Sequence, residues 1–307
     1  MMEPDVNLPY PDQEERRRVF WSVYILDKLC SCGRGRPSAL ADIHCQVQLP
    51  CDEENFRNGT KKKTLTLKQA FSPTKSTIDY PSQLALVILT ASVIGRCAQY
   101  SIHECTRSEG HLPPWDSQSE FAAIYSLLLQ LETRFDLGDR ITEALKRDCI
   151  RDGEIDMQLA GPVIFSHALF HTCQCILHHP FLIYQHCKAR GLKAPQSFTN
   201  RALQTCRESA CAISQLLQDV KEASSVSFFS FIGFCTTVAC SVHTLYLNDE
   251  NILLQQQAQK YLQSDMLFME EFCQYWKHGL PMVSWPRGYE PFLTSLSCSG
   301  PNHTKPL

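Results

Sequence analysis

The sequence predicts an all-α fold, an irregular multi-helix bundle. Apolar residues recur at spacings of three and four over several segments, and few stretches alternate with the period of a strand. No short-period repeat is present, which favours an irregular bundle over a repeat protein. The 307 residues are 44% hydrophobic and 20% charged, so the chain can bury a large core.

The first helix is predicted to begin at residues 12–15, "DQEE", which follow Pro11 and resemble a capping box. Gly33 and Gly35 are expected to end it, and Arg36-Pro37 then requires extended backbone. Four residues with helical spacing are expected to form its buried stripe: Val19, Val23, Leu26 and Cys30.

Further elements follow in order. Alternation at 45–49 predicts a short extended stretch, and 51–79 is a poorly periodic connector. Ser117 and Glu120 form a second capping box, and Pro162 suits a helical first turn. The predicted helices after the connector cover residues 80–101, 120–135, 162–179, 200–219, 226–247 and 250–278, with a loop at 103–116.

Residues 226–247 contain no acidic or basic side chain and are long enough to cross a bilayer. They include several Ser and Thr residues and His243, and Lys/Arg clusters do not flank them. A helix buried on all sides within a helical core has the same composition. We therefore expect a core helix and no membrane contact, with membrane association as an alternative.

Charge and cysteine content restrict the function further. The net charge of −3 argues against a surface that binds DNA phosphates, which requires a basic surplus. None of the 16 cysteines forms a C-x-x-C pair, the usual spacing for structural zinc. We expect reduced, mostly buried cysteines in an intracellular protein.

Catalytic motifs are missing: the chain contains no G-x-S-x-G, H-E-x-x-H or P-loop. The best metal candidate is His167, His171 and Cys175, but one straight helix cannot bring three residues spaced by four to one ion. Catalytic, cofactor and metal residues are therefore predicted to be none. A Cys/His nucleophile near His167–Cys175 remains the enzyme alternative.

The arginine-rich start of the chain requires a separate explanation. Arg16, Arg17 and Arg18 point about 100° apart on a helix and cannot form one flat basic face. We expect Arg17 to stack on Trp21, and Asp27 to pair with Arg34 or Arg36 from the next loop. These contacts would fasten the loop to the helix. A DNA-contacting patch is the competing interpretation.

The same residues resemble the signature of the fungal-specific transcription factor domain, the middle region of fungal zinc binuclear-cluster transcription factors. The run "EERRRVFWSVYILDK", then "GRP" and an Asp-Ile…Leu-Pro ending follow the order of that signature. Its matching positions are Glu15, Arg16, Arg17, Arg18, Phe20, Trp21, Tyr24, Asp27, Lys28, Gly35, Arg36, Pro37, Leu40, Asp42, Ile43, Leu49 and Pro50.

The resemblance implies a regulatory domain over residues 1–290, its C-terminal portion, with a flexible tail at 291–307. The family's six-cysteine zinc cluster, with C-x2-C-x6-C spacing, is absent. The first half of the regulatory domain is also expected to be missing, as in a partial gene model or a relative without the cluster. Zinc and DNA binding are therefore implied only for a module outside this chain.

The resulting hypothesis is a non-catalytic regulatory domain that controls transcription in the nucleus. Its helical core is expected to hold a small-molecule effector or to contact a co-regulator. The domain is also expected to form a homodimer. The alternatives are the Cys/His enzyme and the membrane-associated protein.

Overall fold

The computed structural model describes residues 8–32, 36–72, 82–106, 112–151, 153–223 and 229–279. Gly33, Arg34, Gly35 and the predicted tail at 291–307 lie outside them. The elements in order are α1 (Tyr10–Ser31), η1 (Asp42–His44), α2 (Glu53–Arg57), α3 (Leu67–Ala70), α4 (Gln83–Thr106), α5 (Glu120–Phe135), α6 (Ile141–Asp148), β1 (Ile150–Arg151), β2 (Glu154–Ile155), α7 (Met157–Leu177), α8 (Pro180–Arg190), α9 (Gln196–Ala223), α10 (Ile232–Thr244), α11 (Ile252–Tyr275) and η2 (Lys277–Gly279).

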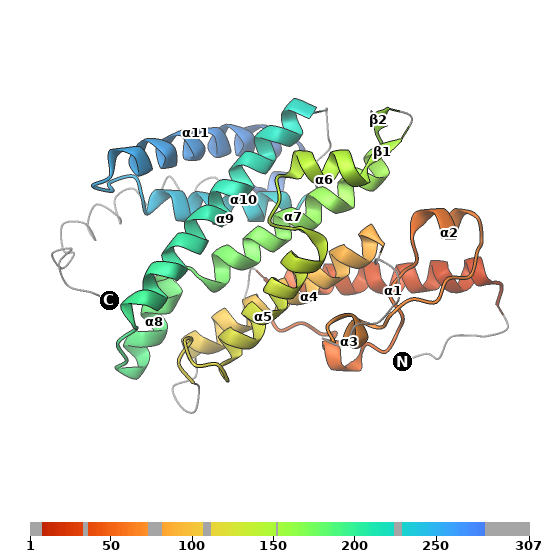
Figure 1. Cartoon of the computed structure of the whole chain (residues 1–307), viewed down its shortest axis with the longest axis horizontal. Coiled ribbons are helices and arrows are strands. Elements are labelled where there is room, and N and C mark those ends of the chain that lie inside the picture. Colours follow the sequence, from red (N-terminus) through yellow and green to blue (C-terminus); the bar gives the residue numbers. More distant parts are fainter. Residues whose placement is uncertain are drawn as a thin grey trace.

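The predicted all-α class is confirmed, because the described residues are mostly helical and a two-stranded hairpin is their only sheet. Helix α7 is central: α4 packs on one part of it, α9 and α10 on others (Figure 1). Its side chains are buried on every side from Leu159 to Cys175. Such a helix is apolar all round, as expected for the core of a large domain.

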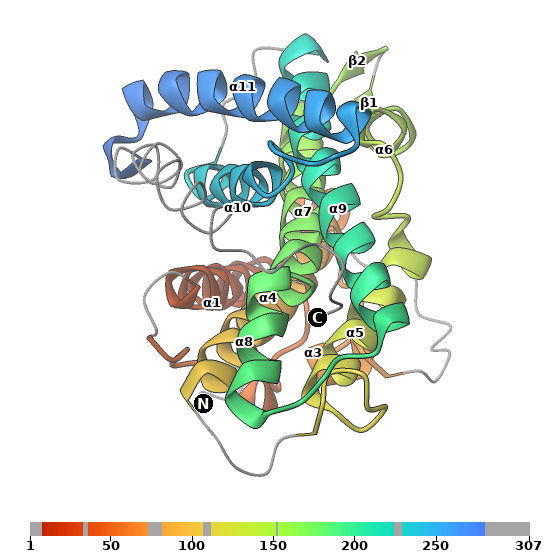
Figure 2. The same ribbon diagram turned by 90° about the vertical axis from the view of Figure 1, so that its left-hand side faces the viewer.

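The helices form two groups along α7. Figure 2 shows α10 and α11 stacked at one end of the molecule, with α1, α4, α5 and α8 toward the other. Contacts of α9 with α7, α10 and α11 join the groups. A hairpin of β1 and β2 follows α6, with Ile150 paired to Ile155.

Helix starts agree with the sequence only in part. Ser119, not Ser117, caps α5 by accepting a hydrogen bond from the backbone N–H of Ala122 at 3.1 Å. Helix α7 begins before the expected Pro162, after an Asp156 cap, and Pro162 lies inside it. Helix α8 and the hairpin were not predicted.

The predicted capping box at residues 12–15 is wrong. Helix α1 begins at Tyr10, and its N-cap is Pro9, which forms no side-chain cap. Pro11 lies in the first turn, where its missing N–H leaves no intrahelical bond unmade. The acidic residues of this segment are therefore free for other contacts.

The predicted buried stripe of α1 is also wrong. Val19 is 59% exposed, Val23 52% and Leu26 60%, and Cys30 is exposed as well. The opposite face is buried instead and carries Glu14, Trp21, Tyr24, Lys28 and Ser31. Helix α1 thus packs on α4 through large aromatic rings and paired charges rather than through its aliphatic residues.

The connector at 51–79 contains two short helices, α2 and α3, which the sequence did not reveal. In the expected extended stretch at 45–49, Gln48 forms an isolated antiparallel bridge with Thr66. The segment after α1 therefore runs back along that helix and returns through α3 toward the core (Figure 1).

Two described stretches, Gln83–Ile102 and Met157–Arg190, are long and apolar enough to cross a membrane by length and composition. Within each, 78% of the most apolar window is buried inside the protein, as in any core helix, so this is weak support for a span. In the apolar segment 226–247, helix α10 covers 13 residues, and Cys235 and His243 are buried in it.

The orientation of α1 can be tested with a matched pair of valines. Val23→Ala should change the free energy of unfolding by less than about 0.5 kcal/mol, because Val23 is half exposed. Val93→Ala on α4 should cost about 2 kcal/mol, because Val93 is 0% exposed. Chemical denaturation measures both free energies. A larger loss of stability for Val23→Ala than for Val93→Ala would mean that the Val23 face of α1 is buried.

Candidate functional site

Three carboxylates hold the segment at residues 36–57 against α1 and α4. We call Glu14, Asp27 and Asp42 the carboxylate anchor. Glu14 and Asp27 lie on α1, one near each end, and Asp42 begins η1. Each accepts hydrogen bonds from residues distant in sequence. The anchor lies within the arginine-rich signature.

Glu14 is 0% exposed and collects donors from two directions. Its carboxylate forms ion pairs with Arg17 and with Arg18, and its Oε1 accepts the backbone N–H of Cys51 at 2.9 Å. Arg18 extends further and donates to Glu53 Oε2 at 2.7 Å. Buried carboxylates require such partners, so Glu14 ties α1 to the start of α2.

Asp27 performs the loop fastening that the sequence predicted, with different partners. Its carboxylate accepts the Ser38 hydroxyl and the backbone N–H groups of Ala39 at 3.0 Å and Leu40 at 2.9 Å. Burial opposes ionisation, but these donors lower the pKa of Asp27 below its usual value. Of the two arginines expected to pair with Asp27, Arg36 is exposed and Arg34 lies outside the described residues.

Asp42 joins three elements. Its carboxylate accepts the hydroxyls of Tyr24 on α1 and Ser92 on α4, each at 2.6 Å. Lys28 Nζ lies 2.9 Å from it and Arg96 Nη2 also 2.9 Å. Burial raises the pKa of Asp42, but the hydroxyls and Lys28 outweigh burial and hold it low. Two cations and two hydroxyls thus compensate one mostly buried charge.

Trp21 completes the connection on the buried face of α1. Its indole N–H donates to the Gln48 carbonyl at 2.8 Å, and its ring packs edge-on against Phe20 and Tyr24. The expected stacking of Arg17 on this ring is replaced by the ion pair of Arg17 with Glu14. Two cation–π contacts lie in this region: Arg18 is 4.0 Å from the ring centroid of Phe56, and Lys28 Nζ is 4.9 Å from that of Tyr24.

The remaining signature residues divide by exposure. Glu15, Arg16, Arg36 and Pro37 are exposed, whereas Pro50 is buried. The sequence predicted Glu15 as the acidic residue of the signature, but its neighbour Glu14 makes the buried contacts. Arginines 17 and 18 therefore serve the interior of the protein, and Arg16 faces solvent.

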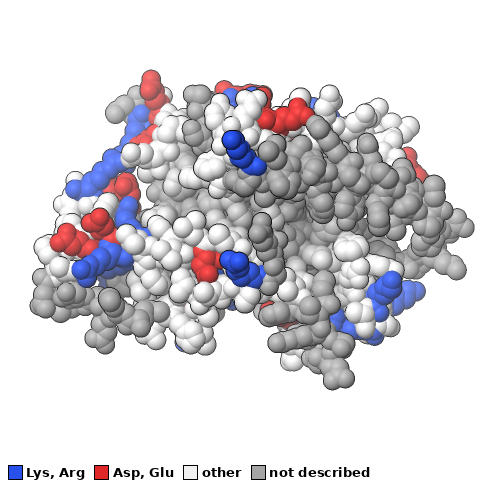
Figure 3. Space-filling model, turned by 180° about the vertical axis from the view of Figure 1, so that it is seen from behind, with Lys and Arg blue, Asp and Glu red and all other residues white. Residues whose placement is uncertain are grey.

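Charged side chains on the visible surface do not form a continuous basic area. On the face seen in Figure 3, described lysines and arginines adjoin aspartates and glutamates at the left and centre, and a separate basic group lies at the lower right. Mixed signs give little attraction for a phosphate backbone. The DNA-patch interpretation therefore gains no support on this face.

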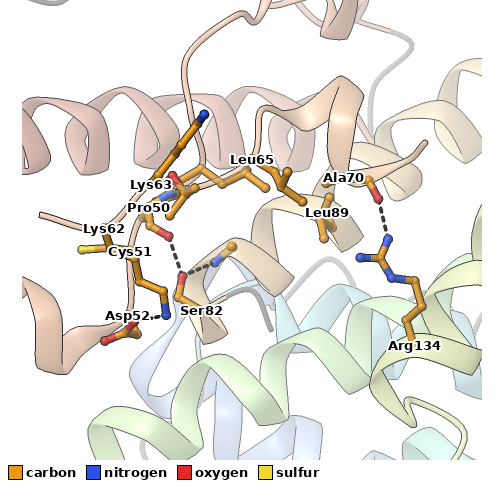
Figure 4. A pocket seen from close by; sticks show the side chains of 13 residues that line it. Pro50, Cys51, Asp52, Lys62, Lys63, Leu65, Ala70, Ser82, Leu89 and Arg134 are labelled. Atoms are coloured by element: carbon orange, nitrogen blue, oxygen red, sulfur yellow. Dashed lines mark hydrogen bonds and ion pairs between the residues drawn. The ribbon is translucent and has the colours of Figure 1, made fainter. Parts of the chain in front are cut away.

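A small pocket adjoins the anchor where residues 49–52 and 62–65 meet α4 (Figure 4). Its volume is ≈ 20 Å³, which is about the space that one water molecule needs. Ser82 at its wall donates to the Pro50 carbonyl at 2.9 Å, and Arg134 donates to the Ala70 carbonyl at 2.6 Å. This pocket is too small for an organic effector.

The histidines and cysteines of α7 are core residues. His167 is 2% exposed and Cys175 0%. Burial lowers the pKa of His167 to about 4 and raises that of the Cys175 thiol well above its usual value. A nucleophilic cysteine needs the opposite shift. Among the described residues, no group of three His, Cys, Asp or Glu side chains has a metal-binding arrangement.

A second polar cluster, which sequence reasoning missed, lies where α9, α10 and α11 meet. Ser214, His243 and Asp265 are each at most 1% exposed and are joined by hydrogen bonds through the serine hydroxyl. A signal was present: Asp265 occupies the apolar stripe of its helix with Phe268, Met269 and Phe272. A carboxylate at such a position needs a buried partner.

Comparison with known proteins shows a family resemblance in the first part of the chain. Residues 3–134 match the family model described as "Fungal specific transcription factor domain". This segment contains the whole carboxylate anchor with α4 and most of α5. The resemblance noted in the sequence is therefore confirmed.

Individual relatives agree with this class. The chain is similar to the Zn(2)-C6 fungal-type transcription factor FTF1c of Fusarium oxysporum f. sp. lycopersici, 22% identical over 280 residues, 88% of this chain and 29% of the relative. It is also similar to a transcriptional regulatory protein of Schizosaccharomyces pombe, 24% identical, with 89% of this chain and 43% of the relative covered. A shorter match, 29% identical over 94 residues, joins 30% of this chain to 15% of the sorbicillinoid biosynthetic cluster transcription factor 1 of Penicillium rubens.

The chain thus spans 29% of the length of FTF1c and 43% of that of the Schizosaccharomyces pombe protein. No solved structure matches it. Because these relatives are transcription factors, the comparisons favour the regulatory interpretation over the Cys/His enzyme.

Glu14 and Glu15 give a matched test of the anchor. Glu14→Gln should lower the free energy of unfolding by about 2–3 kcal/mol, because two arginines and a buried amide lose their charged partner. Glu15→Gln, on an exposed neighbour, should change it by less than about 0.5 kcal/mol. Urea denaturation compares them, and equal effects would contradict the anchor.

The partners of Asp27 can be separated in the same way. Ser38→Ala should cost about 1 kcal/mol, since the Ser38 hydroxyl donates to Asp27. Arg36→Ala should cost less than about 0.5 kcal/mol, since Arg36 is exposed. Thermal unfolding compares the two variants. If Arg36→Ala lowers stability more than Ser38→Ala does, the arginine and not the serine is the main partner of Asp27.

Proposed function

We propose that this chain is a non-catalytic regulatory domain of a fungal transcription factor. The observation that carries the proposal is the family match over residues 3–134, which coincides with the carboxylate anchor. The relatives that cover 88–89% of the chain are named as transcriptional regulators, which supports the same assignment for the later helices. Such a protein acts in the nucleus.

The regulatory mechanism that we propose is conformational. The anchor fixes residues 36–57 on α1 and α4, and α4 packs along the central α7. A change at α1 would therefore reach the core through a rigid connection. The pocket beside the anchor has room for about one water and so does not hold a small effector, and the partner that we propose is a transcriptional co-regulator. Homodimerisation is part of the same proposal.

DNA binding is assigned to a separate zinc-cluster module rather than to these residues. The sequence has no C-x2-C-x6-C run, and Arg17 and Arg18 are engaged with Glu14. The cysteines present do not fit a binuclear cluster, since most of those described are buried as single thiols. The purified chain should accordingly show no salt-dependent affinity for duplex DNA.

A tethering experiment tests the function. The chain is fused to an unrelated DNA-binding domain, and a reporter gene with the corresponding site is measured in a fungal host. We expect the fusion to change expression several-fold relative to the DNA-binding domain alone. Glu14→Gln should reduce this effect because it loosens the anchor, whereas Glu15→Gln should retain it.

Immunoblotting keeps the fusion proteins comparable in amount. A fusion that leaves the reporter at the level of the DNA-binding domain alone would contradict a regulatory role. Salt-sensitive retention of DNA by the purified chain would instead move DNA recognition into it.

A further inference from the structure

Helices α9, α10 and α11 meet at one buried polar contact. Ser214 of α9 lies 2.8 Å through its Oγ from His243 Nε2 of α10 and 2.7 Å from Asp265 Oδ2 of α11. The ring nitrogen and the carboxylate are themselves 3.7 Å apart. One hydroxyl therefore lies between an acid and a base, each from a different helix.

The surroundings provide no compensating charge. In the described part of the chain, Asp265 has no lysine or arginine as an ion-pair partner, and its Oδ1 is buried without a hydrogen-bond partner. The titratable groups that face it are Cys211 of α9, Cys240 of α10 and Tyr261 of α11, and burial raises the pKa of all three. All three are therefore uncharged at neutral pH.

Hydrogen-bond directions restrict where a proton can lie. If Asp265 is protonated, Oδ2–H donates to Ser214 Oγ, and the serine hydroxyl donates to His243 Nε2. The Ala210 carbonyl is farther from that hydroxyl, at 3.2 Å, and also accepts a hydrogen bond from the His243 ring, which opposes the lowering of its pKa by burial. Each group is then neutral, and the unpartnered Oδ1 is a carbonyl oxygen rather than part of an ion. An ionised Asp265 would leave a charged oxygen unsolvated, which costs more.

We propose that Asp265 and His243 hold one proton between them through Ser214, that it resides on Asp265 rather than on His243, and that this uncharged chain fastens α11 to α9 and α10. The assignment inverts the order of the free side chains, in which histidine is the stronger base. Between about pH 4 and 6.5, folding therefore moves a proton from the imidazole to the carboxylate. The proposal does not depend on the regulatory function.

The pKa shifts agree with this inversion. Burial raises the pKa of Asp265 from 3.8 to about 7 and lowers that of His243 from 6.5 to about 4. A raised carboxyl pKa means that stability is lost as pH rises from about 4 to 7. A lowered histidine pKa means that stability is gained over nearly the same range. The two slopes cancel, so the intact pair contributes little pH dependence.

Single substitutions should reveal the pH dependence of stability that each group contributes. In Asp265→Asn only the histidine titrates, and the unfolding equilibrium constant should fall on the order of 50-fold between pH 4.5 and 7, relative to the unsubstituted chain. In His243→Gln only the carboxyl titrates, and that constant should rise on the order of 100-fold over the same interval. Urea denaturation of the full chain at several pH values measures both.

The double variant, Asp265→Asn with His243→Gln, should recover the pH profile of the unsubstituted chain, and Glu250→Gln, an exposed carboxyl, should not alter it. Slopes of the same sign in the two single variants would overturn the proposal. Isotope-edited infrared spectroscopy of the unsubstituted chain gives a test that needs no folded variant. A protonated aspartic acid band at pH 5.5, below the raised pKa of Asp265, supports the assignment, and a spectrum with carboxylate bands alone at that pH contradicts it.

Discussion

Asp42 needs compensation for its charge because only 16% of its side chain reaches solvent. Its partners come from α1 and α4, so satisfying the carboxylate sets the position of these two helices and of η1 together. Lys28 is drawn to the inner face of α1 by the same requirement and also binds the Leu40 carbonyl. Removing one partner of such a group costs more than the pair contributes, which makes the arrangement hard to change piece by piece.

This constraint explains why the buried face of α1 was predicted incorrectly. Helical spacing favoured Val23 as interior, and by hydropathy alone Lys28 belongs outside. In the protein Lys28 is 5% exposed and Val23 52%. The spacing of apolar residues predicts which apolar side chains are buried. It cannot predict that Lys28 is buried, because the partner of Lys28, Asp42, comes from another segment. The all-α class and the extent of α5, residues 120–135, were predictable because they depend on local residues, although the cap is Ser119 and not Ser117.

The second polar cluster was unpredictable for a related reason. Ser214, His243 and Asp265 come from three helices, and their pairing depends on how those helices pack. The sequence did show a carboxylate inside the apolar stripe of α11 and a histidine inside an apolar segment. Each observation alone indicates a residue that needs a partner. The identity of the partner requires the tertiary structure.

The two clusters solve the same problem in different ways. At the anchor, hydrogen-bond donors lower the pKa values of Asp27 and Asp42, and Lys28 of α1 and Arg96 of α4 form ion pairs with Asp42. Around Asp265 no such cation is present among the described residues, and in our proposal a proton takes its place. The family match ends at residue 134, so it includes the carboxylate anchor and not the cluster of Ser214, His243 and Asp265. The anchor therefore fastens its helices with charged groups, whereas Ser214, His243 and Asp265 join α9, α10 and α11 through the uncharged chain that we propose.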